Sequence, residues 1–337
     1  MGACTNESAC LRQYPREELP DGVTLSIICV NWNSLKYLIQ CIASIYENPP
    51  EATYEVIVVD NASPEGGVEI LIERFPSVKI VKSGRNLGFA GANNLGFRQS
   101  VGRYIFLLNP DTSIIGPAIS LMLGHLRSLP DAGVVGCTLL NSNLSVASNS
   151  IQKFPTILNQ LFTAEWLRLR FPALPLWDIA PLFSESRDAH KVDVIPGACM
   201  MLGRDVFERV GMLTEDYFMY AEDIDLNYKI SRLGLTSYYV GQAKIIHHGG
   251  RSSAMQKGSH WPTIMTYQAM WRFFRMRRGY LYAIGYRAST GCAALMRLAF
   301  LVAMLPLMER AGIRAAMAKW RSILKWAIGM EQRETSR

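Results

Sequence analysis

The chain has 337 residues, of which 49% are hydrophobic and 19% charged, so it is long and apolar enough to fold around a substantial core. This composition excludes a disordered or low-complexity protein. The formal net charge is +7, but residues 268–330 alone carry eleven Lys or Arg and one acid, a net of +10. Charge concentrated in the C-terminal fifth is not the even basic surface of a nucleic-acid binder, and no nucleic-acid partner is expected.

The N-terminal stretch and the cysteines are typical of a cytosolic protein. Residues 1–22 are polar and lack the apolar run of a secretory signal, so we expect a loose lead-in there. Seven cysteines occur without any C-x-x-C spacing, and an odd number does not suit a disulfide framework. Buried, reduced thiols are therefore expected rather than disulfides or a metal site.

Short apolar runs alternate with helical stretches in the first part of the chain. Five runs have the length and continuity of buried strands: 25–30, 56–60, 78–81, 104–108 and 134–139. Four helices are predicted between them: 35–46, 65–75, 88–100 and 117–128. Strand starts recur about every 25–30 residues, the size of a βαβ unit, which predicts an α/β fold with a mainly parallel, Rossmann-like sheet and helices on both faces.

The remaining chain is irregular before it becomes helical. Residues 141–190 mix aromatic residues, Arg and Pro, and predict a long loop or insertion over the site. Further elements are expected at 192–202, 204–210, 222–233, 236–240 and 244–247, with helices from 262 onward. We therefore expect three segments: the lead-in 1–22, a main α/β domain 23–260 and a basic, apolar helical region 261–337.

Three of the predicted strands end in Asn or Asp. Asn31 and Asn33 follow the first strand, Asp60 ends the second, and Asn109 and Asp111 follow the fourth. Asn and Asp also cap turns, so each alone is weak evidence of function. Together they indicate a site, because ligands of such sheets bind beyond the carboxyl ends of the strands. A carboxylate in the position of Asp111 can bind Mg²⁺ or Mn²⁺, and the metal ion in turn can coordinate a diphosphate.

A stretch rich in Gly and Asn, residues 84–96, opens the third predicted helix. Its small residues let the backbone approach a ligand closely, and a helix N-terminus favours an anion. Asn86, Gly88 and Asn93 are its candidate contacts. The stretch is neither a Walker A loop nor the dinucleotide fingerprint, which would follow the first strand. The alternative is a Gly-rich turn capped by Asn.

Acidic residues gather at the start of a later predicted helix, where Glu222, Asp223 and Asp225 fall within four positions. Acids there suit the helix dipole, so capping alone would explain them. Two adjacent carboxylates that face a cleft would instead provide a general base. His247 and His248 follow the last predicted strand. A His there can bind a metal or contact a phosphate, and His247 is the stronger candidate.

In this order the motifs resemble the family 2 inverting glycosyltransferases, and most of all their bacterial rhamnosyltransferase branch. The resemblance covers about residues 24–280. As a combination the motifs are specific for the family and much less specific for the sugar. They are Val30-Asn31-Trp32-Asn33, Val59-Asp60-Asn61-Ala62-Ser63, the run 86–94, Asn109-Pro110-Asp111, Pro196-Gly197-Ala198, Glu222-Asp223-Ile224-Asp225 and His247-x-Gly249-Gly250-x-Ser252.

The resemblance implies a GT-A-type fold over residues 23–260 and a nucleotide-sugar donor. It assigns Asp223 as catalytic base with Glu222 as its acidic neighbour. It assigns Asp111 and His247 to a divalent metal, Mg²⁺ or Mn²⁺, in contact with the diphosphate. The implied donor contacts, nucleoside and sugar together, are Asn31, Asn33, Asp60, Asn86, Gly88, Asn93, Gly197 and Ala198.

The chain departs from the family pattern at three places. Asn109 stands where the first acid of the D-x-D motif is usual, which weakens metal binding. Ala92 replaces a usual Gly, and residues 214–216 replace the usual Asp-Glu ahead of an aromatic pair. None of these changes falls on Asp223.

The resemblance thus implies an inverting, metal-dependent transferase that moves L-rhamnose from dTDP-rhamnose to a hydroxyl of a cell-surface polysaccharide or lipid-linked glycan. Two alternatives stay open: a UDP- or GDP-sugar donor, and a catalytically inactive nucleotide-sugar-binding protein. A nucleotidyltransferase is disfavoured, because it needs a Gly-rich loop with a basic residue directly after the first strand. Neither the acceptor linkage nor the oligomeric state follows from the sequence.

Residues 280–308 are strongly apolar but contain Arg287 and Arg297. Their longest uncharged run, 298–308, has eleven residues, short of the roughly 20 that a spanning helix needs. With the surrounding Arg, Lys and Trp, the region predicts an interfacial amphipathic segment on an anionic membrane surface. The protein would then be cytoplasmic and peripheral on the inner face of the cell membrane. The alternative is a helical subdomain that packs on the main domain.

Overall fold

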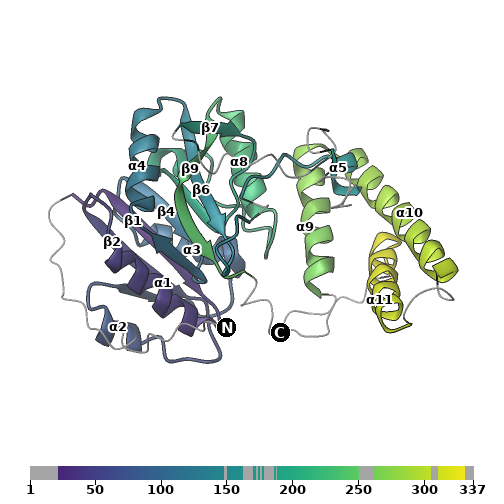
Figure 1. The fold of residues 1–337 in the computed structure, drawn as a ribbon, viewed down its shortest axis with the longest axis horizontal. Coiled ribbons are helices and arrows are strands. Elements are labelled where there is room, and N and C mark those ends of the chain that lie inside the picture. The colour runs from purple at the N-terminus through teal and green to yellow at the C-terminus, as the bar shows by residue number, and fades with distance from the viewer. Residues whose placement is uncertain are drawn as a thin grey trace. The chain divides into compact units, whose positions relative to one another are not determined.

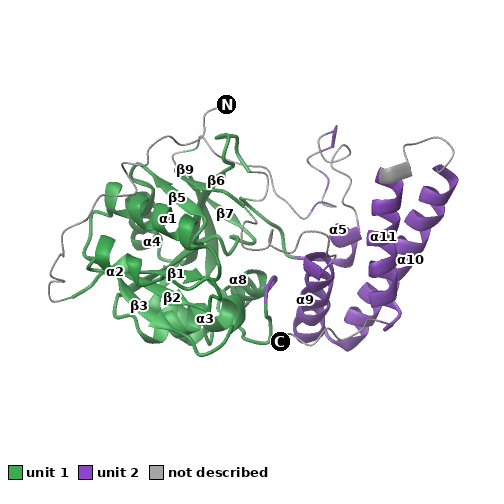
Figure 2. Cartoon of the chain, turned by 90° about the horizontal axis from the view of Figure 1, so that it is seen from below, with its two compact units in different colours: residues 1–154, 179–218, 222–255 green, residues 155–178, 219–221, 256–337 purple. Residues whose placement is uncertain are grey.

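A computed structural model describes residues 22–147, 150–161, 170, 171, 174, 177, 186, 188–249, 261–304 and 310–330. Residues 1–21 of the expected lead-in 1–22, most of the irregular insertion and the end of the His247 motif therefore lie outside the described residues. The chain divides into two compact units (Figure 2). Unit 1 comprises Met1–Phe154, Ile179–Phe218 and Glu222–Met255, and unit 2 comprises Pro155–Asp178, Met219–Ala221 and Gln256–Arg337.

The described part of unit 1 is an α/β domain built on one sheet of nine strands (Figure 1). Its strands are β1 (Leu25–Asn31), β2 (Tyr54–Asp60), β3 (Lys79–Lys82), β4 (Tyr104–Leu108), β5 (Thr112–Ile115), β6 (Ala132–Leu140), β7 (Ala189–Val192), β8 (Cys199–Gly203) and β9 (Thr236–His247). Its helices are α1 (Leu35–Glu47), α2 (Ile70–Arg74), α3 (Gly88–Arg98), α4 (Ala118–Ser128), α7 (Arg204–Arg209) and α8 (Glu222–Arg232).

The strand order is β3-β2-β1-β4-β8-β6-β9-β5, with β7 paired to β9. Strands β1 to β4 run parallel to one another, as predicted. The rest of the sheet is mixed, which corrects the expectation of a mainly parallel sheet: β8 is antiparallel to both β4 and β6, and β9 is antiparallel to β5 and β7. A continuous apolar run shows that a strand is buried but not which way it runs, because the connections set its direction.

Both faces of the sheet are covered by helices, which explains why its strands read as continuous apolar runs. Ile27 and Cys29 of β1 pack with residues of α1 and α4 in one core cluster. Ile28, between them, packs with residues of α3 and α8 in a second cluster on the opposite face. Successive strand side chains point to opposite faces, so burial on both sides requires every position to be apolar. The predicted α/β class with helices on both faces is confirmed.

Unit 2 is helical, as predicted for the C-terminal region. It contains α5 (Ile157–Leu161), α9 (Trp261–Arg277), α10 (Tyr280–Met304) and α11 (Arg310–Ala327). Helix α10 packs against α5, α9 and α11. The centre of this packing is aromatic: the Phe274 ring lies 5.0 Å from that of Tyr282 and 4.9 Å from that of Tyr286, which also contacts Trp326 at 6.2 Å.

Helix α10 is the single helix among the described residues that is long and apolar enough to cross a membrane, judged by length and composition alone. Its 25 residues exceed the eleven-residue uncharged run, because the helix continues through both arginines. Only 17% of its most apolar window is buried. Such a helix is weak evidence of a membrane span, because the core helix of a soluble protein can pass the same test.

Candidate active site

Asn31, at the end of β1, organises the loops that follow β1 and β2. Its amide nitrogen donates to Asp60 Oδ1 at 3.2 Å and to Ser63 Oγ at 3.0 Å. Its carbonyl oxygen accepts from both the backbone and the hydroxyl of Ser34. The side chain is completely buried and its hydrogen-bonding groups are engaged within the protein. Asn31 therefore positions Asp60 and the neighbouring backbone, rather than presenting a vacant donor to a nucleoside.

The Gly- and Asn-rich stretch is fixed by Asn61, which the sequence analysis did not single out as a site residue. The Asn61 amide donates to Asn86 Oδ1 at 2.9 Å, and its carbonyl oxygen accepts from Leu87 N at 2.8 Å. Asn86 Oδ1 in turn accepts from Gly88 N at 2.9 Å. Gly88 has φ +71°, and a Cβ there would lie 2.3 Å from the carbonyl oxygen of Phe218. Helix α3 thus begins where only glycine fits.

The other two asparagines of the predicted donor set, Asn33 and Asn93, also have hydrogen-bond partners within the protein. Asn33 has φ 51°, and its side-chain oxygen accepts from Glu65 N at 3.2 Å. Asn93 is buried and donates to the carbonyl of Phe89, one turn earlier in α3, at 2.9 Å. Asn94, next to it, was not predicted as a site residue. It exchanges hydrogen bonds with the backbone of Leu213 and so ties α3 to the segment that precedes α8.

Glu222 and Asp223 form the first turn of α8, where the dipole favours acids. Burial raises the pKa of Glu222 well above its usual range, and the nearby charge of Asp223 raises it further. Its Oε2 is buried and has no hydrogen-bond partner among the described residues. A buried carboxyl with an unsatisfied oxygen is less costly when neutral, so this environment favours the protonated form of Glu222.

Asp223 is half-buried and more solvated than Glu222. Gly197 N donates to its Oδ2 and Ile224 N donates to its Oδ1, both at 2.8 Å. Burial raises the pKa of Asp223, and these backbone donors, which favour the charged form, oppose that rise. The two carboxylate oxygens together offer about four acceptor sites, more than the backbone donors use. This is the electrostatic setting of a general base: ionisable, held in place and more basic than a solvated Asp.

The turn 196–198 before β8 joins the acidic helix to the end of β4. Gly197 donates to Asp223, and a Cβ on Gly197 would lie 3.3 Å from Asp223 Cβ. The carbonyl oxygen of Ala198 accepts from Asn109 N at 3.0 Å. The structure therefore brings the predicted residues Gly197, Ala198 and Asp223 together at the strand-end edge of the sheet.

Asp111 and His247 meet because β5 pairs antiparallel with β9, in the register Thr112 opposite His247. Asp111 Oδ1 lies 3.3 Å from His247 Nε2, and Asp111 is buried. Asn109 Nδ2 lies 3.5 Å from the same ring nitrogen. The neighbouring His248 takes another direction: its Nδ1 lies 2.9 Å from Ser142 Oγ. The preference for His247 over His248 is consistent with this geometry.

The donor chemistry of this pair can be tested against a divalent cation. Neighbouring ligands of an octahedral Mg²⁺ or Mn²⁺ lie about 3 Å apart, close to the separation of the Asp111 and His247 atoms. Within the described residues, however, no group of three His, Cys, Asp or Glu gathers to hold a metal. Mg²⁺ sites commonly use one or two protein ligands and complete their shell with substrate phosphates. The two residues therefore fit such a cation only in company with diphosphate oxygens.

Two curated relatives cover most of this chain. The N-acetylglucosaminyl-diphospho-decaprenol L-rhamnosyltransferase of Mycobacterium tuberculosis is 27% identical over 248 residues, which make up 70% of this chain and 80% of the relative. The rhamnosyltransferase WbbL of Escherichia coli K12 is 26% identical over 234 residues, 67% of this chain and 85% of the relative. At this identity the relatives support a glycosyltransferase and leave the donor sugar open.

The fold has a counterpart among solved structures. The mannosyltransferase PcManGT from Pyrobaculum calidifontis, solved in complex with GDP-Man and Mn²⁺, matches with a TM-score of 0.56 over 98% of this chain and 93% of its own. The two sequences are only 16% identical, so the likeness establishes the GT-A-type fold alone. The family model for glycosyl transferase family 2 matches residues 26–211, more than half of the chain. The chain belongs to glycosyl transferase family 2 and resembles its bacterial rhamnosyltransferases.

Proposed function

We propose that the chain is an inverting, metal-dependent rhamnosyltransferase that uses dTDP-L-rhamnose and glycosylates a hydroxyl of a lipid-linked glycan or polysaccharide. The observation that carries the proposal is the setting of Asp223: a half-buried carboxylate with a raised pKa, held by two backbone donors beside the 196–198 turn. The rhamnose and lipid-linked parts draw on the relatives, one of which acts by its name on a decaprenol-linked substrate.

The reaction follows from these groups. Asp223 accepts the proton of the acceptor hydroxyl as that oxygen attacks the anomeric carbon from the face opposite the diphosphate. The carbon–oxygen bond to the diphosphate breaks, and its electron pair leaves with the nucleotide. One displacement inverts the anomer and needs no covalent intermediate. The raised pKa of Glu222 favours its neutral form, so the negative charge of the acidic pair is favoured on Asp223, the half-buried member.

Asp111 and His247 would hold the divalent cation, Mg²⁺ or Mn²⁺, which supplies neutralisation of the charge on the leaving diphosphate. The proposed donor surface comprises Asn33, Asp60, Asn86, Gly88, Asn93 and Ala198. The side chains of Asn31, Asn61 and Asn86 fix its backbone by accepting from the N–H groups of Ser34, Leu87 and Gly88. These residue assignments are part of the proposal.

We assign residues 23–260 to the transferase domain and 261–337 to a membrane-directed region. The protein would act on the cytoplasmic face of the cell membrane as a peripheral protein. The support is the net charge of +10 over residues 268–330, which suits an anionic membrane surface. A lipid-linked acceptor would be anchored in the same membrane surface.

The test is binding of dTDP, UDP and GDP to the purified chain by calorimetry, with and without Mn²⁺ or Mg²⁺. We expect metal-dependent preference for dTDP, followed by transfer of rhamnose with an inverted anomer in the NMR spectrum of the product. A preference for UDP or GDP would keep the transferase and discard rhamnose. If none of the three nucleotides bound, the result would favour the alternative that the chain is catalytically inactive.

A further inference from the structure

Helix α10 exposes a continuous apolar face. Its exposed positions recur every three or four residues, which is one side of a helix. We call this face the apolar stripe; it consists of Leu281, Ile284, Ala288, Cys292, Leu295, Ala299 and Val302. Leu281 is 83% exposed and Leu295 55%, and Met296 and Phe300 beside the stripe are exposed as well. An exposed apolar surface of this length marks an interaction site.

The two charges of α10 are turned away from the stripe. Arg287 donates through Nε and a terminal nitrogen to the carbonyls of Ala327 and Trp326 at the end of α11, at 3.0 and 2.6 Å. Arg297 donates to the carbonyl of Leu161 at 3.2 Å, and its guanidinium lies 4.2 Å from the centre of the Trp320 ring. Both arginines are thus held by other helices of unit 2, and the stripe carries no charge.

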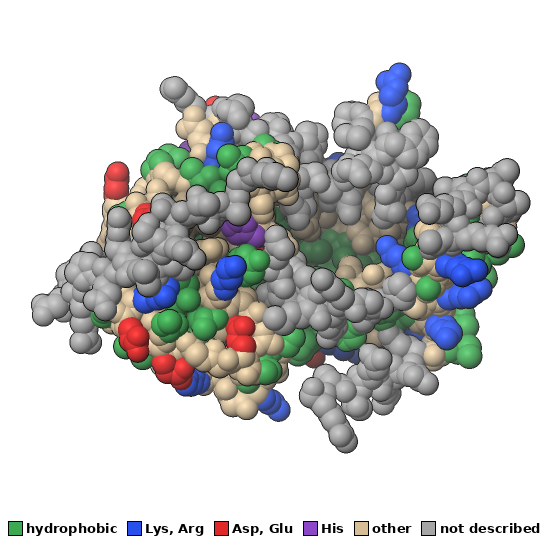
Figure 3. Space-filling view, turned by 60° about the horizontal axis from the view of Figure 1, so that its bottom comes forward, with side chains coloured by type: hydrophobic (Ala, Val, Ile, Leu, Met, Phe, Trp, Pro, Cys, Tyr) green, Lys and Arg blue, Asp and Glu red, His purple; other side chains and the backbone are tan. Residues whose placement is uncertain are grey.

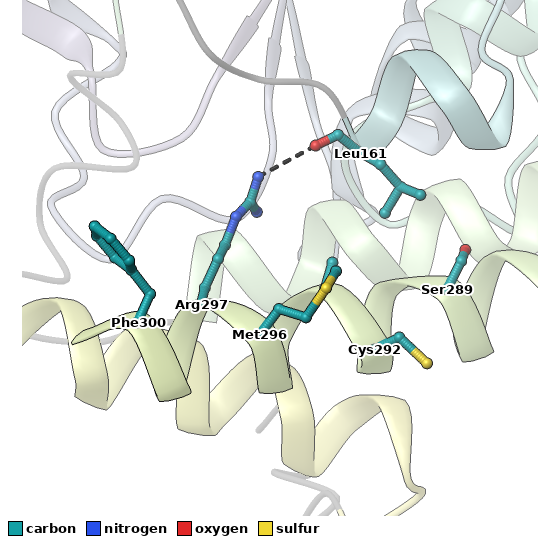
Figure 4. Close-up of a pocket in the computed structure, with 7 residues that line it drawn as sticks. Leu161, Ser289, Cys292, Met296, Arg297 and Phe300 are labelled. Atoms are coloured by element: carbon teal, nitrogen blue, oxygen red, sulfur yellow. Dashed lines mark hydrogen bonds between the residues drawn. The ribbon is translucent and has the colours of Figure 1, made fainter. Parts of the chain in front are cut away.

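A recess borders the stripe. It has a volume of about 600 Å³ and is lined by Leu161, Ser289, Cys292, Ala293, Met296, Arg297 and Phe300. Figure 4 shows the labelled side chains of α10 together with Leu161 of α5, whose carbonyl oxygen accepts a hydrogen bond from Arg297 at one edge. The walls are almost entirely apolar, so an alkyl chain suits the recess better than a polar ligand does.

The charges near the apolar stripe indicate which kind of partner surface would cover it. Residues 261–330 contain one acid, Glu309, against eleven Lys or Arg. On α11 the exposed cations are Arg314, Lys319, Arg321 and Lys325. Figure 3 shows hydrophobic and basic side chains side by side on the visible face of unit 2. An apolar helix face with a basic surround complements the surface of an anionic bilayer, where acyl chains and phosphate groups lie next to each other.

We propose that α10 lies flat in the interface of an anionic lipid bilayer, with the apolar stripe toward the acyl chains. This deepens, and rests on, the membrane association proposed above. A spanning orientation is disfavoured by the arginines, because each is five residues, about 7.5 Å, from the midpoint Cys292. Both would lie inside a hydrocarbon core that extends about 15 Å from its centre, where charge is costly.

Depth measurements on the full chain distinguish the two orientations. Cys292 is an exposed thiol on the stripe, and the described cysteines of unit 1 are buried, so a fluorescent label can be placed on Cys292 once Cys4 and Cys10 are changed to Ser. Two further variants carry the label at Leu281→Cys or Val302→Cys with Cys292→Ala. On vesicles containing phosphatidylglycerol we expect all three labels at the same shallow depth. A deep Cys292 label with both ends at opposite surfaces would establish a span and overturn the proposal.

Vesicle co-sedimentation tests the face itself. Leu295→Asp is expected to lower binding to anionic vesicles at least tenfold, whereas Val101→Asp, at an exposed apolar site of unit 1, should leave it unchanged. Equal loss in both variants, or equal binding to neutral phosphatidylcholine vesicles, would refute the stripe as an anionic-lipid face.

Nucleotide binding without vesicles is expected to be the same in all variants. If the parent protein bound no nucleotide, that result would count against the transfer reaction and not against the membrane face.

Discussion

Replacing Asp223 by Asn removes the proposed base while keeping the shape of the side chain. A general base typically contributes about 10²–10⁴-fold, so kcat should fall by that factor, equivalent to roughly 3–5 kcal/mol in activation free energy. Nucleotide binding should be unchanged, because Asp223 is not placed among the donor contacts. The assay is the initial rate of rhamnose transfer to acceptor at saturating donor, together with calorimetric binding of dTDP.

The same change has a predictable effect on stability. Asp223 accepts from two backbone donors, Gly197 N and Ile224 N, one on each oxygen. Asn has one oxygen, so one backbone N–H would face an NH₂ group and lose its partner. An unsatisfied buried donor costs about 1–3 kcal/mol, and the solvent around a half-buried group reduces that cost. Thermal unfolding of the variant should therefore show a modest loss that does not explain a hundredfold fall in rate.

Asp225 provides a matched control on the same helix. It is fully buried, accepts from the Thr214 hydroxyl at 2.6 Å and lies 3.9 Å from Lys229 Nζ. Asp225→Asn should lower stability while the folded protein keeps its rate. Wild-type kcat in Asp223→Asn, or an equal loss of rate in both variants, would refute the assignment of Asp223 as the base.

Three other changes test separate parts of the site. Glu222→Gln should become more stable relative to the parent as pH rises. In the parent, the folded state favours the neutral Glu222 carboxyl; the stability that this contributes is fully present below the usual pKa of 4.5 and is lost as pH rises through the raised folded pKa. Denaturant unfolding of both proteins at pH 5 and pH 8 would measure the difference. His247→Ala should reduce metal-dependent dTDP affinity in calorimetry, whereas His248→Ala should not; equal effects would remove His247 from the metal site. Gly88→Ala should destabilise the fold by at least about 1–2 kcal/mol, because its φ of +71° is left-handed, and Gly84→Ala, where a Cβ meets nothing within 4 Å, should be neutral in the same unfolding measurement.

The sequence predicts strand positions well because burial on both faces leaves a continuous apolar signal. The strand at 104–108 agrees with β4, and β1, β2 and β6 differ from their predictions by two residues or fewer at each end. The pattern fails where the chain is polar or kinked. β5, residues 112–115, was missed because it begins with Thr-Ser, and β9 was divided in two at its irregularity, where the register with β6 jumps from Val240 to Lys244.

The candidate site, like the fold, can be predicted from the sequence only in part. Asn and Asp at strand ends can be located from sequence, because the strands themselves can be. Whether such a side chain faces a ligand or is engaged by the protein depends on partners far along the chain. Asn31 bonds to Asp60 and Ser63, and Asn94 bonds to the backbone more than a hundred positions away. Asn61 lies within a recognised motif, but its role as the clamp on Asn86 becomes visible only in three dimensions.

The direction of β8 determines whether this site can assemble. Because β8 is antiparallel to β4, with Cys199 opposite Leu108, the turn that precedes β8 lies beside the carboxyl ends of β1, β2 and β4. A parallel β8 of the same five residues would carry that turn to the other edge of the sheet, about 16 Å away. Gly197 then would not reach Asp223, nor Ala198 the backbone of Asn109. The mixed sheet, which the apolar pattern did not predict, is therefore what brings the proposed base and the proposed metal ligands to one edge.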